Sequence, residues 1–124
     1  MSYRLISKSE IERSRLNELI VKETAEQLMK DFATFGMHID FPEDLNFAYQ
    51  ELYEQLVIII EQLLRDNPEK LSAMLYQIDL DEKKIRNTVD QGVLEHELLS
   101  ELILEREFMK VLTRHYFKNY SKGD

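Results

Sequence analysis

The sequence has no cysteine, and only three glycines and two prolines occur among its 124 residues. The missing cysteine excludes disulfide bonds, thiolate metal sites and cysteine nucleophiles. Glycine and proline each cost about 1 to 3 kcal/mol inside a helix, so their scarcity permits long helices. A chain without disulfides fits a reducing compartment, and we expect the protein to be cytoplasmic.

Long hydrophobic stretches are also missing. The longest unbroken apolar run is residues 56–60, whereas a membrane-spanning helix needs about 20 apolar residues. Residues 1–10 lack the apolar segment of a secretory signal peptide. We therefore expect no membrane span and no secretion signal.

Basic residues are scarce in the middle of the chain. The net charge is −8, and residues 41–67 contribute −5 of it through six acidic residues and one basic residue. Nucleic acids and anionic membranes are bound through clustered Lys and Arg, so we expect neither as a partner. A solvated acidic helix face that keeps the protein soluble is the simple explanation.

Apolar residues recur with a helical period along most of the chain. Between residues 45 and 64 they follow a 4-3-4-3-4 spacing, and a second file widens the apolar arc to about half of the helix circumference. Gly36 and the pair Asn67-Pro68 mark a helix end and a helix start. The predicted helices cover residues 10–35, 42–66, 68–78, 82–91 and 93–116, with Ser9, Asp40, Asn67 and either Asp79 or Asp81 as N-caps.

The sequence thus predicts a single domain over residues 1–124. Its fold class is all-α, a bundle of four or five helices with short connections. Residues 1–8 are expected to form a flexible arm and residues 119–124 a polar tail. Gly92 either ends the helix over 82–91 or lies inside a longer helix.

Two predicted helices have more apolar surface than a single small bundle needs. Phe47 and Ile58 lie on the side of their helix opposite its main apolar face. The last helix has a second apolar stripe through Leu104, Phe108 and Val111. We predict that these five residues form an interface, either in a homodimer or with another helical protein.

Glu101 and Glu105 project into the main apolar arc of the last helix, and we predict that they are buried acids. Carboxylates in that position must be paired with Lys or Arg, held protonated, or exposed by a local gap. A structural ion pair is the simpler interpretation. The alternative is a carboxylate site for a small ligand or cation.

No motif in the sequence supports catalysis or metal binding. The run His96-Glu97-Leu98-Leu99-Ser100 lacks the second histidine of a zinc-protease helix, and no Glu-x-x-His pair of a di-iron bundle occurs. The acidic residues 79–82 precede no calcium loop, and there is no Gly-x-Ser-x-Gly elbow. We therefore predict no catalytic residue, no metal ligand and no cofactor. An enzyme whose active site lies between subunits stays open as the less favoured class.

The last helix repeats a basic residue every four positions. These residues are Arg106, Lys110, Arg114, Lys118 and Lys122. Bases are favourable near a helix C-terminus, so a solvated face explains them simply. The alternative is a contact with the acidic helix of a partner or of a neighbouring subunit.

Two stretches resemble a type of short, uncharacterised all-helical bacterial protein. They are Met-Leu-Tyr-Gln-Ile-Asp-Leu-Asp-Glu-Lys-Lys-Ile over 74–85 and Glu-Leu-Ile-Leu-Glu-Arg-Glu over 101–107. The resemblance implies a helical fold, with the turn at 76–81 as a structural signature, and implies no activity or site. From the sequence we therefore expect a non-enzymatic interaction or assembly protein, with a ligand-binding bundle as the alternative.

Overall fold

The computed structural model describes residues 6–80, 83 and 95–122, and within these ranges every regular element is helical. The elements are α1 (Lys8–Ser14), α2 (Glu18–Ala33), the 3-10 helix η2 (Leu45–Phe47), α3 (Ala48–Asp66), α4 (Pro68–Ile78) and α6 (Glu95–Lys122). The predicted all-α bundle with short connections is confirmed. None of the helices in the described ranges is long and apolar enough to cross a membrane. The expected helix over 82–91 and the question of Gly92 lie outside the described residues.

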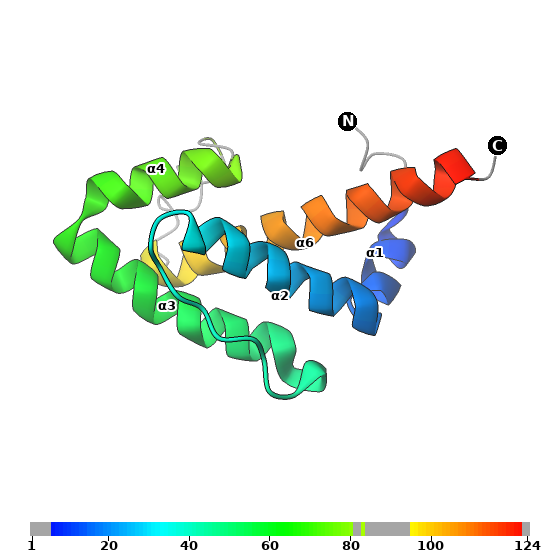
Figure 1. The fold of residues 1–124 in the computed structure, drawn as a ribbon, viewed down its shortest axis with the longest axis horizontal. Helices are drawn as coiled ribbons and strands as arrows, with labels where there is room; N and C mark the ends of the chain where they lie inside the picture. The colour runs from blue at the N-terminus through cyan, green and yellow to red at the C-terminus, as the bar shows by residue number, and fades with distance from the viewer. Residues whose placement is uncertain (1–5, 81–82, 84–94, 123–124) are drawn as a thin grey trace.

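α6 is the central element of the bundle. It packs along both α2 and α3, and α4 packs against α3 and α6 at one end. Figure 1 shows α6 (yellow to red) running past α2, with α4 at the far end from its C-terminus and α1 beside its C-terminal half. Because α6 contacts every other long helix, its side chains decide how the bundle is held together.

The helix predicted over 10–35 is broken into α1 and α2. Asn17 causes the break, because its side-chain oxygen accepts hydrogen bonds from the backbone N–H groups of Leu19 and Ile20, at 2.9 and 3.2 Å. This is an N-cap, and it starts a new helix. The predicted Ser9 cap is also wrong by two residues, since Ser7 accepts from the Glu10 N–H at 3.2 Å.

α2 ends at Ala33, two residues before the predicted end, and Gly36 turns the chain after it as expected. Gly36 adopts φ 74°, a left-handed conformation that a residue without a Cβ reaches without strain. The N–H groups of Gly36 and Met37 donate to the carbonyls of Ala33 and Phe32, at 2.9 and 3.0 Å. These bonds satisfy the last carbonyls of α2 and turn the chain away.

The connection from α2 to α3 is longer than predicted, because Asp40 does not cap a helix. Its N–H and carbonyl instead exchange hydrogen bonds with the Gln55 side chain, at 2.8 and 3.0 Å. Asp44 provides the cap, accepting from the Asn46 N–H at 2.9 Å at the start of η2. Ile39, 1% exposed, anchors the connection in the core.

α4 starts and ends where the sequence predicted. Asn67 caps it through the Lys70 N–H at 3.2 Å, and Pro68 occupies the first turn. Asp79, however, is not an N-cap. It ends α4 in the left-handed region at φ 67°, and its carbonyl and carboxylate both accept from Arg106, at 3.2 and 3.3 Å. Asp81, the other expected cap, lies outside the described residues.

The main core fills the space between α2, α3, α4 and α6. Its thirteen buried side chains are Ala25, Leu28, Phe32, Ile39, Leu52, Leu56, Ile60, Leu63, Leu71, Met74, Ile78, Leu99 and Ile103. Most come from the apolar files that the sequence pattern identified. The core therefore confirms the helical periods, including that of residues 45–64.

A second, smaller core joins α1, the start of α2 and the C-terminal half of α6. It contains Ile6, Ile20, Phe108, Val111 and Leu112. Ile6 belongs to the expected arm over 1–8 yet is only 6% exposed, and Lys8 begins α1. At the other terminus, α6 continues to Lys122, so residues 119–122 of the expected polar tail are helical.

We expect Leu56→Ala to lower the free energy of unfolding by about 2 to 5 kcal/mol, because it leaves a cavity in the main core. Leu56 has no exposed surface, whereas Ile58, two residues along the same helix, is 61% exposed. Ile58→Ala should therefore change stability by no more than about 0.5 kcal/mol. Urea unfolding followed by circular dichroism measures both, and equal effects would contradict the packing described.

Candidate functional site

An open cleft of about 430 Å³ lies between the end of α1 and the facing sides of α3 and α6. The residues that line it are Arg15, Tyr49, Gln50, Tyr53, Glu101, Leu104 and Glu105. Three helices that are distant in the sequence thus contribute to one concave surface. It combines aromatic, acidic and apolar groups, which suits recognition of a ligand with both charge and apolar surface.

The α6 wall of the cleft holds the two acids that the sequence singled out. Glu101 and Glu105 both line the cleft, but both are exposed. The prediction that they are buried is therefore wrong. One of the three alternatives given from the sequence was exposure by a local gap. The cleft in front of these positions of α6 is such a gap.

The α3 wall is aromatic. Tyr49 and Tyr53 are one helical turn apart, and Tyr49 packs edge-to-face on Phe108 of α6, with 6.0 Å between ring centroids. Burial, and then the charges of Glu97 and Glu101, raise the pKa of the Tyr53 hydroxyl above its ordinary value of 10.0. The two carboxylates therefore act on the Tyr53 hydroxyl, whereas Tyr49 on the same wall lies near the positive charge of Arg15, which acts to lower its pKa against the larger effect of burial.

α1 closes the cleft through a single cationic side chain. The Arg15 guanidinium lies over the ring of Phe108, 4.5 Å from its centroid, in a cation–π contact. None of the seven residues of α1 is buried. The segment is attached to the bundle through Ile11, which is partly buried against the second core, and through its flanks, Ile6 before it and Arg15 after it.

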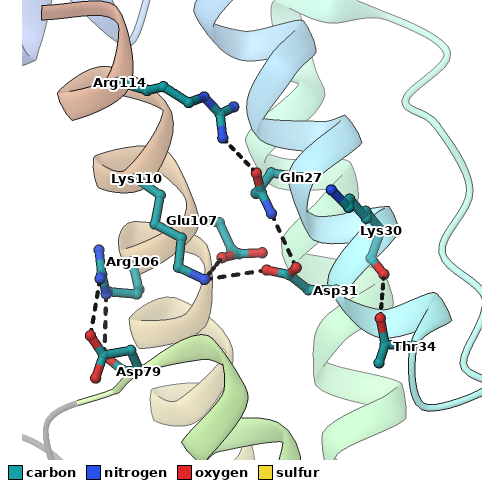
Figure 2. A network of polar contacts seen from close by, with 9 residues as sticks. All are labelled: Gln27, Lys30, Asp31, Thr34, Asp79, Arg106, Glu107, Lys110 and Arg114. Atoms are coloured by element: carbon teal, nitrogen blue, oxygen red, sulfur yellow. Dashed lines mark hydrogen bonds and ion pairs between the residues drawn. The ribbon is translucent and has the colours of Figure 1, made fainter. Parts of the chain in front are cut away.

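A second polar group lies on the opposite side of α6, buried against α2. Lys110 of α6 lies 2.9 Å from the carboxylate of Glu107 and 3.3 Å from that of Asp31 on α2. Figure 2 shows the ammonium group of Lys110 between the two carboxylates. Glu107 has no exposed surface, and the Lys110 ammonium group at 2.9 Å is the nearby charge that opposes the cost of burying its carboxyl group.

The pKa values of Asp31 and Glu107 are shifted in opposite directions. Burial, followed by the adjoining Asp31 carboxylate, raises the pKa of Glu107 from 4.5 to about 8, against the opposing effect of Lys110. Burial also acts to raise the pKa of Asp31, but hydrogen bonding with Glu107 and the charge of Lys110 outweigh it, and the pKa falls below 3.8. At neutral pH the group therefore holds Asp31 as a carboxylate, Lys110 as a cation and Glu107 as a neutral acid.

Further polar contacts extend this group along α2 and α6. Gln27 donates to Asp31 at 3.0 Å and accepts from Arg114 at 2.9 Å. One turn further, His115 lies 2.7 Å from the carboxylate of Glu23. Figure 2 shows the Arg114–Gln27–Asp31–Lys110 part of this series, with Arg106 reaching Asp79 beside it. Three residues of the basic repeat, Arg106, Lys110 and Arg114, therefore meet partners within the same chain.

Sequence reasoning missed Glu107, although a signal was present. Leu99, Ile103, Glu107 and Val111 follow one another at intervals of four residues, and all are at most 1% exposed. An acid in line with three buried apolar residues is the residue that the pattern places deepest. The broad apolar arc of the last helix drew the prediction instead to Glu101 and Glu105, whose side of the helix faces the cleft.

The structure separates the five predicted interface residues into two groups. Phe47, the last residue of η2, is 63% exposed, and Ile58 on α3 is 61% exposed. Phe108 and Val111 have no exposed surface, because the second core encloses them, so they cannot contact another subunit and this part of the prediction is wrong. Leu104 is half-buried against the main core and lines the cleft.

In the described ranges no three His, Cys, Asp or Glu side chains are close enough together to hold a metal ion. The histidines of these ranges each lie beside one acid: His38 beside Asp40, His96 beside Glu61 and His115 beside Glu23. The last two pairs join α6 to α3 and to α2. Two of the three described histidines thus link helices, whereas the His38–Asp40 pair lies within the connection between α2 and η2.

We expect Glu107→Gln to change how stability depends on pH. A folded-state pKa of about 8 means that the free energy of unfolding falls as the pH rises from about 4.5 to about 8, because only the unfolded chain then releases the proton. Asp31 acts in the opposite sense, and its stabilising contribution is lost below pH 3.8. The glutamine side chain stays neutral, so the variant should gain stability relative to the natural chain as the pH rises towards 8.

Urea unfolding at a series of pH values between 5 and about 8 measures this difference. The matched control is Glu101→Gln, which changes an exposed acid on the same helix. It should leave the slope of stability against pH unaltered. Parallel curves for Glu107→Gln and the natural chain would contradict a protonated Glu107.

The chain was compared with protein-family models, with curated proteins and with solved structures, and none of the three comparisons gave a match. The resemblance to short helical bacterial proteins therefore stays a prediction. Any function must be inferred from the cleft and from the surface around it.

Proposed function

We propose that this protein is a non-enzymatic interaction module that binds a segment of another protein in the cleft between α1, α3 and α6. The observation that carries the proposal is the composition of the cleft. Two tyrosines, a leucine, two carboxylates and an arginine form one open surface. Tyrosine and arginine are enriched where proteins contact one another, since each combines a large apolar area with a polar tip.

The surroundings of the cleft support a macromolecular partner. Leu16 follows Arg15 directly and is 85% exposed, and Leu19, at the start of α2, is 52% exposed. Large apolar side chains next to a concave site give a partner surface to cover beyond the cleft itself. The polar group around Glu107, by contrast, lies between α2 and α6, where Lys110 contacts both Asp31 and Glu107.

A photo-crosslinking amino acid at position 50 tests the proposal. Gln50 is exposed and lines the cleft, whereas Gln62 is exposed on the same helix, about three turns away. In cells that make the protein, we expect a discrete adduct from position 50 and none from position 62. Glu101→Lys should remove the adduct, because it reverses a charge on the cleft wall.

Equal adducts from both positions, or none from position 50, would contradict a partner in the cleft. The small-ligand alternative predicts a different pattern. A cation or metabolite in the cleft would raise the melting temperature of the purified protein, with no adduct from position 50. Glu105→Gln would then abolish the rise in melting temperature.

A second candidate function is assembly into a homodimer through the outer face of α3. The specific observation that favours it is the exposure of Phe47 and Ile58, which lie about three turns apart on one side of this segment. A twofold interface would bring the same two residues of each copy together.

Under this candidate, light scattering should give twice the 14.8 kDa mass of the chain. Ile58→Asp should restore the monomer mass, since it places a charge within the apolar contact. Gln77→Asp is the matched control, because it introduces the same charge at an exposed polar position of α4, away from the face of α3 that contains Ile58. Monomer mass at all concentrations for the natural chain would exclude the dimer.

A further inference from the structure

The structure contains its own example of what the cleft accepts. The guanidinium group of Arg15 enters from α1, lies 4.5 Å from the centroid of Phe108, and lines the same cleft as Tyr49 and Glu105. Phe108 in turn packs edge-to-face on Tyr49. A planar cation therefore already packs on one aromatic ring, that of Phe108, beside the site, as cation–π attraction favours.

The rest of the cleft has an excess of negative charge. Glu101 and Glu105 line it against the single positive charge of Arg15. Glu97, one turn before Glu101, is close enough to raise the pKa of Tyr53. The acidic side therefore continues along α6 beyond the position that Arg15 reaches.

The spacing of these acids fits an extended basic peptide. Glu97, Glu101 and Glu105 follow at intervals of four residues, so their Cα atoms are about 6 Å apart along the axis of α6. In an extended chain, alternate side chains point to the same side at intervals of about 6.6 to 6.8 Å. Arginine or lysine at every second position of such a peptide would meet successive carboxylates.

We infer that the partner segment bound in the cleft is an extended basic peptide, whose arginine or lysine side chains lie between the tyrosines of α3 and the glutamates of α6. This inference rests on the proposed function and names the chemistry of its partner. The apolar stems of the basic side chains would pack on Leu104 and the tyrosine rings, and their charged ends would face the carboxylates.

The test uses a fluorescent peptide in which arginine alternates with serine, and measures its anisotropy on addition of the full-length protein. The natural chain should bind it, with weaker binding at higher salt, and should not bind the peptide in which glutamate replaces arginine. Glu101→Gln should weaken binding about two- to fivefold, as expected for the loss of one exposed ion pair. Glu69→Gln on α4 makes the same change of charge outside the cleft and should leave the Kd unaltered.

A substitution of Arg15 tests the inference through a change that should strengthen peptide binding. Arg15→Gln removes the one positive charge of the cleft lining and should tighten binding of the arginine peptide about two- to fivefold. Arg15→Lys keeps the charge and should leave the Kd unaltered. Thermal unfolding of both variants shows whether α1 and the second core remain in place.

Three results would overturn the inference. One is an equal loss of affinity for Glu69→Gln and Glu101→Gln, which means attraction to overall charge alone. Another is that Arg15→Gln binds the arginine peptide more weakly than the natural chain does, although its melting temperature is unchanged. The third is that spermidine binds as tightly as the peptide, which assigns the cleft to small polyamines. Suppose that one of these three results is obtained while position 50 still gives a Glu101-dependent adduct in cells. The basic-peptide inference then fails, and the proposed function stands. If that adduct is absent, the proposed function itself fails.

Discussion

The contact of Lys110 with Asp31 and Glu107 is the constraint on which the arrangement of α2 and α6 depends. The three groups are largely removed from water, and Glu107 is removed completely. Taking one partner from a buried ionic group typically costs about 3 to 5 kcal/mol, because an uncompensated charge remains. A slip of one turn between the two helices would bring Lys110 to Gln27 or Phe35 in place of Asp31. The ionic group therefore fixes a register that apolar side chains alone would leave open to adjustment.

That register has a direct effect on the opposite side of α6. Because Glu107 and Lys110 are committed to α2, the side of the helix carrying Glu101, Leu104 and Glu105 is turned towards α3 and α1. Tyr49 then meets Phe108, and Arg15 covers the ring of Phe108. The cleft is thus a consequence of how α6 is held, and its acids stay exposed because no apolar neighbour in the described ranges fills the space in front of them.

Much of the fold could be predicted from the sequence, because helical periods and caps are local signals. The bounds of α4 followed from Asn67, Pro68 and the apolar file that ends at Ile78. The break at Asn17 was missed because the apolar pattern continues across it, and only the side-chain cap reveals the new start. The functional residues were harder to predict. Whether Glu101 or Glu107 is the buried acid depends on which neighbour each side of α6 meets, and the period of one helix does not contain that information.

The second core joins the two ends of the chain. Ile6 packs in the same cluster as Phe108, Val111 and Leu112, about a hundred positions further along. Contacts over such a separation form slowly, since a long loop must close before they contribute. During synthesis on the ribosome, Ile6 and Ile20 emerge well before their partners on α6, which are Phe108, Val111 and Leu112. The face of α2 that will receive α6 thus stays uncovered until α6 itself has been made, and the second core is completed late.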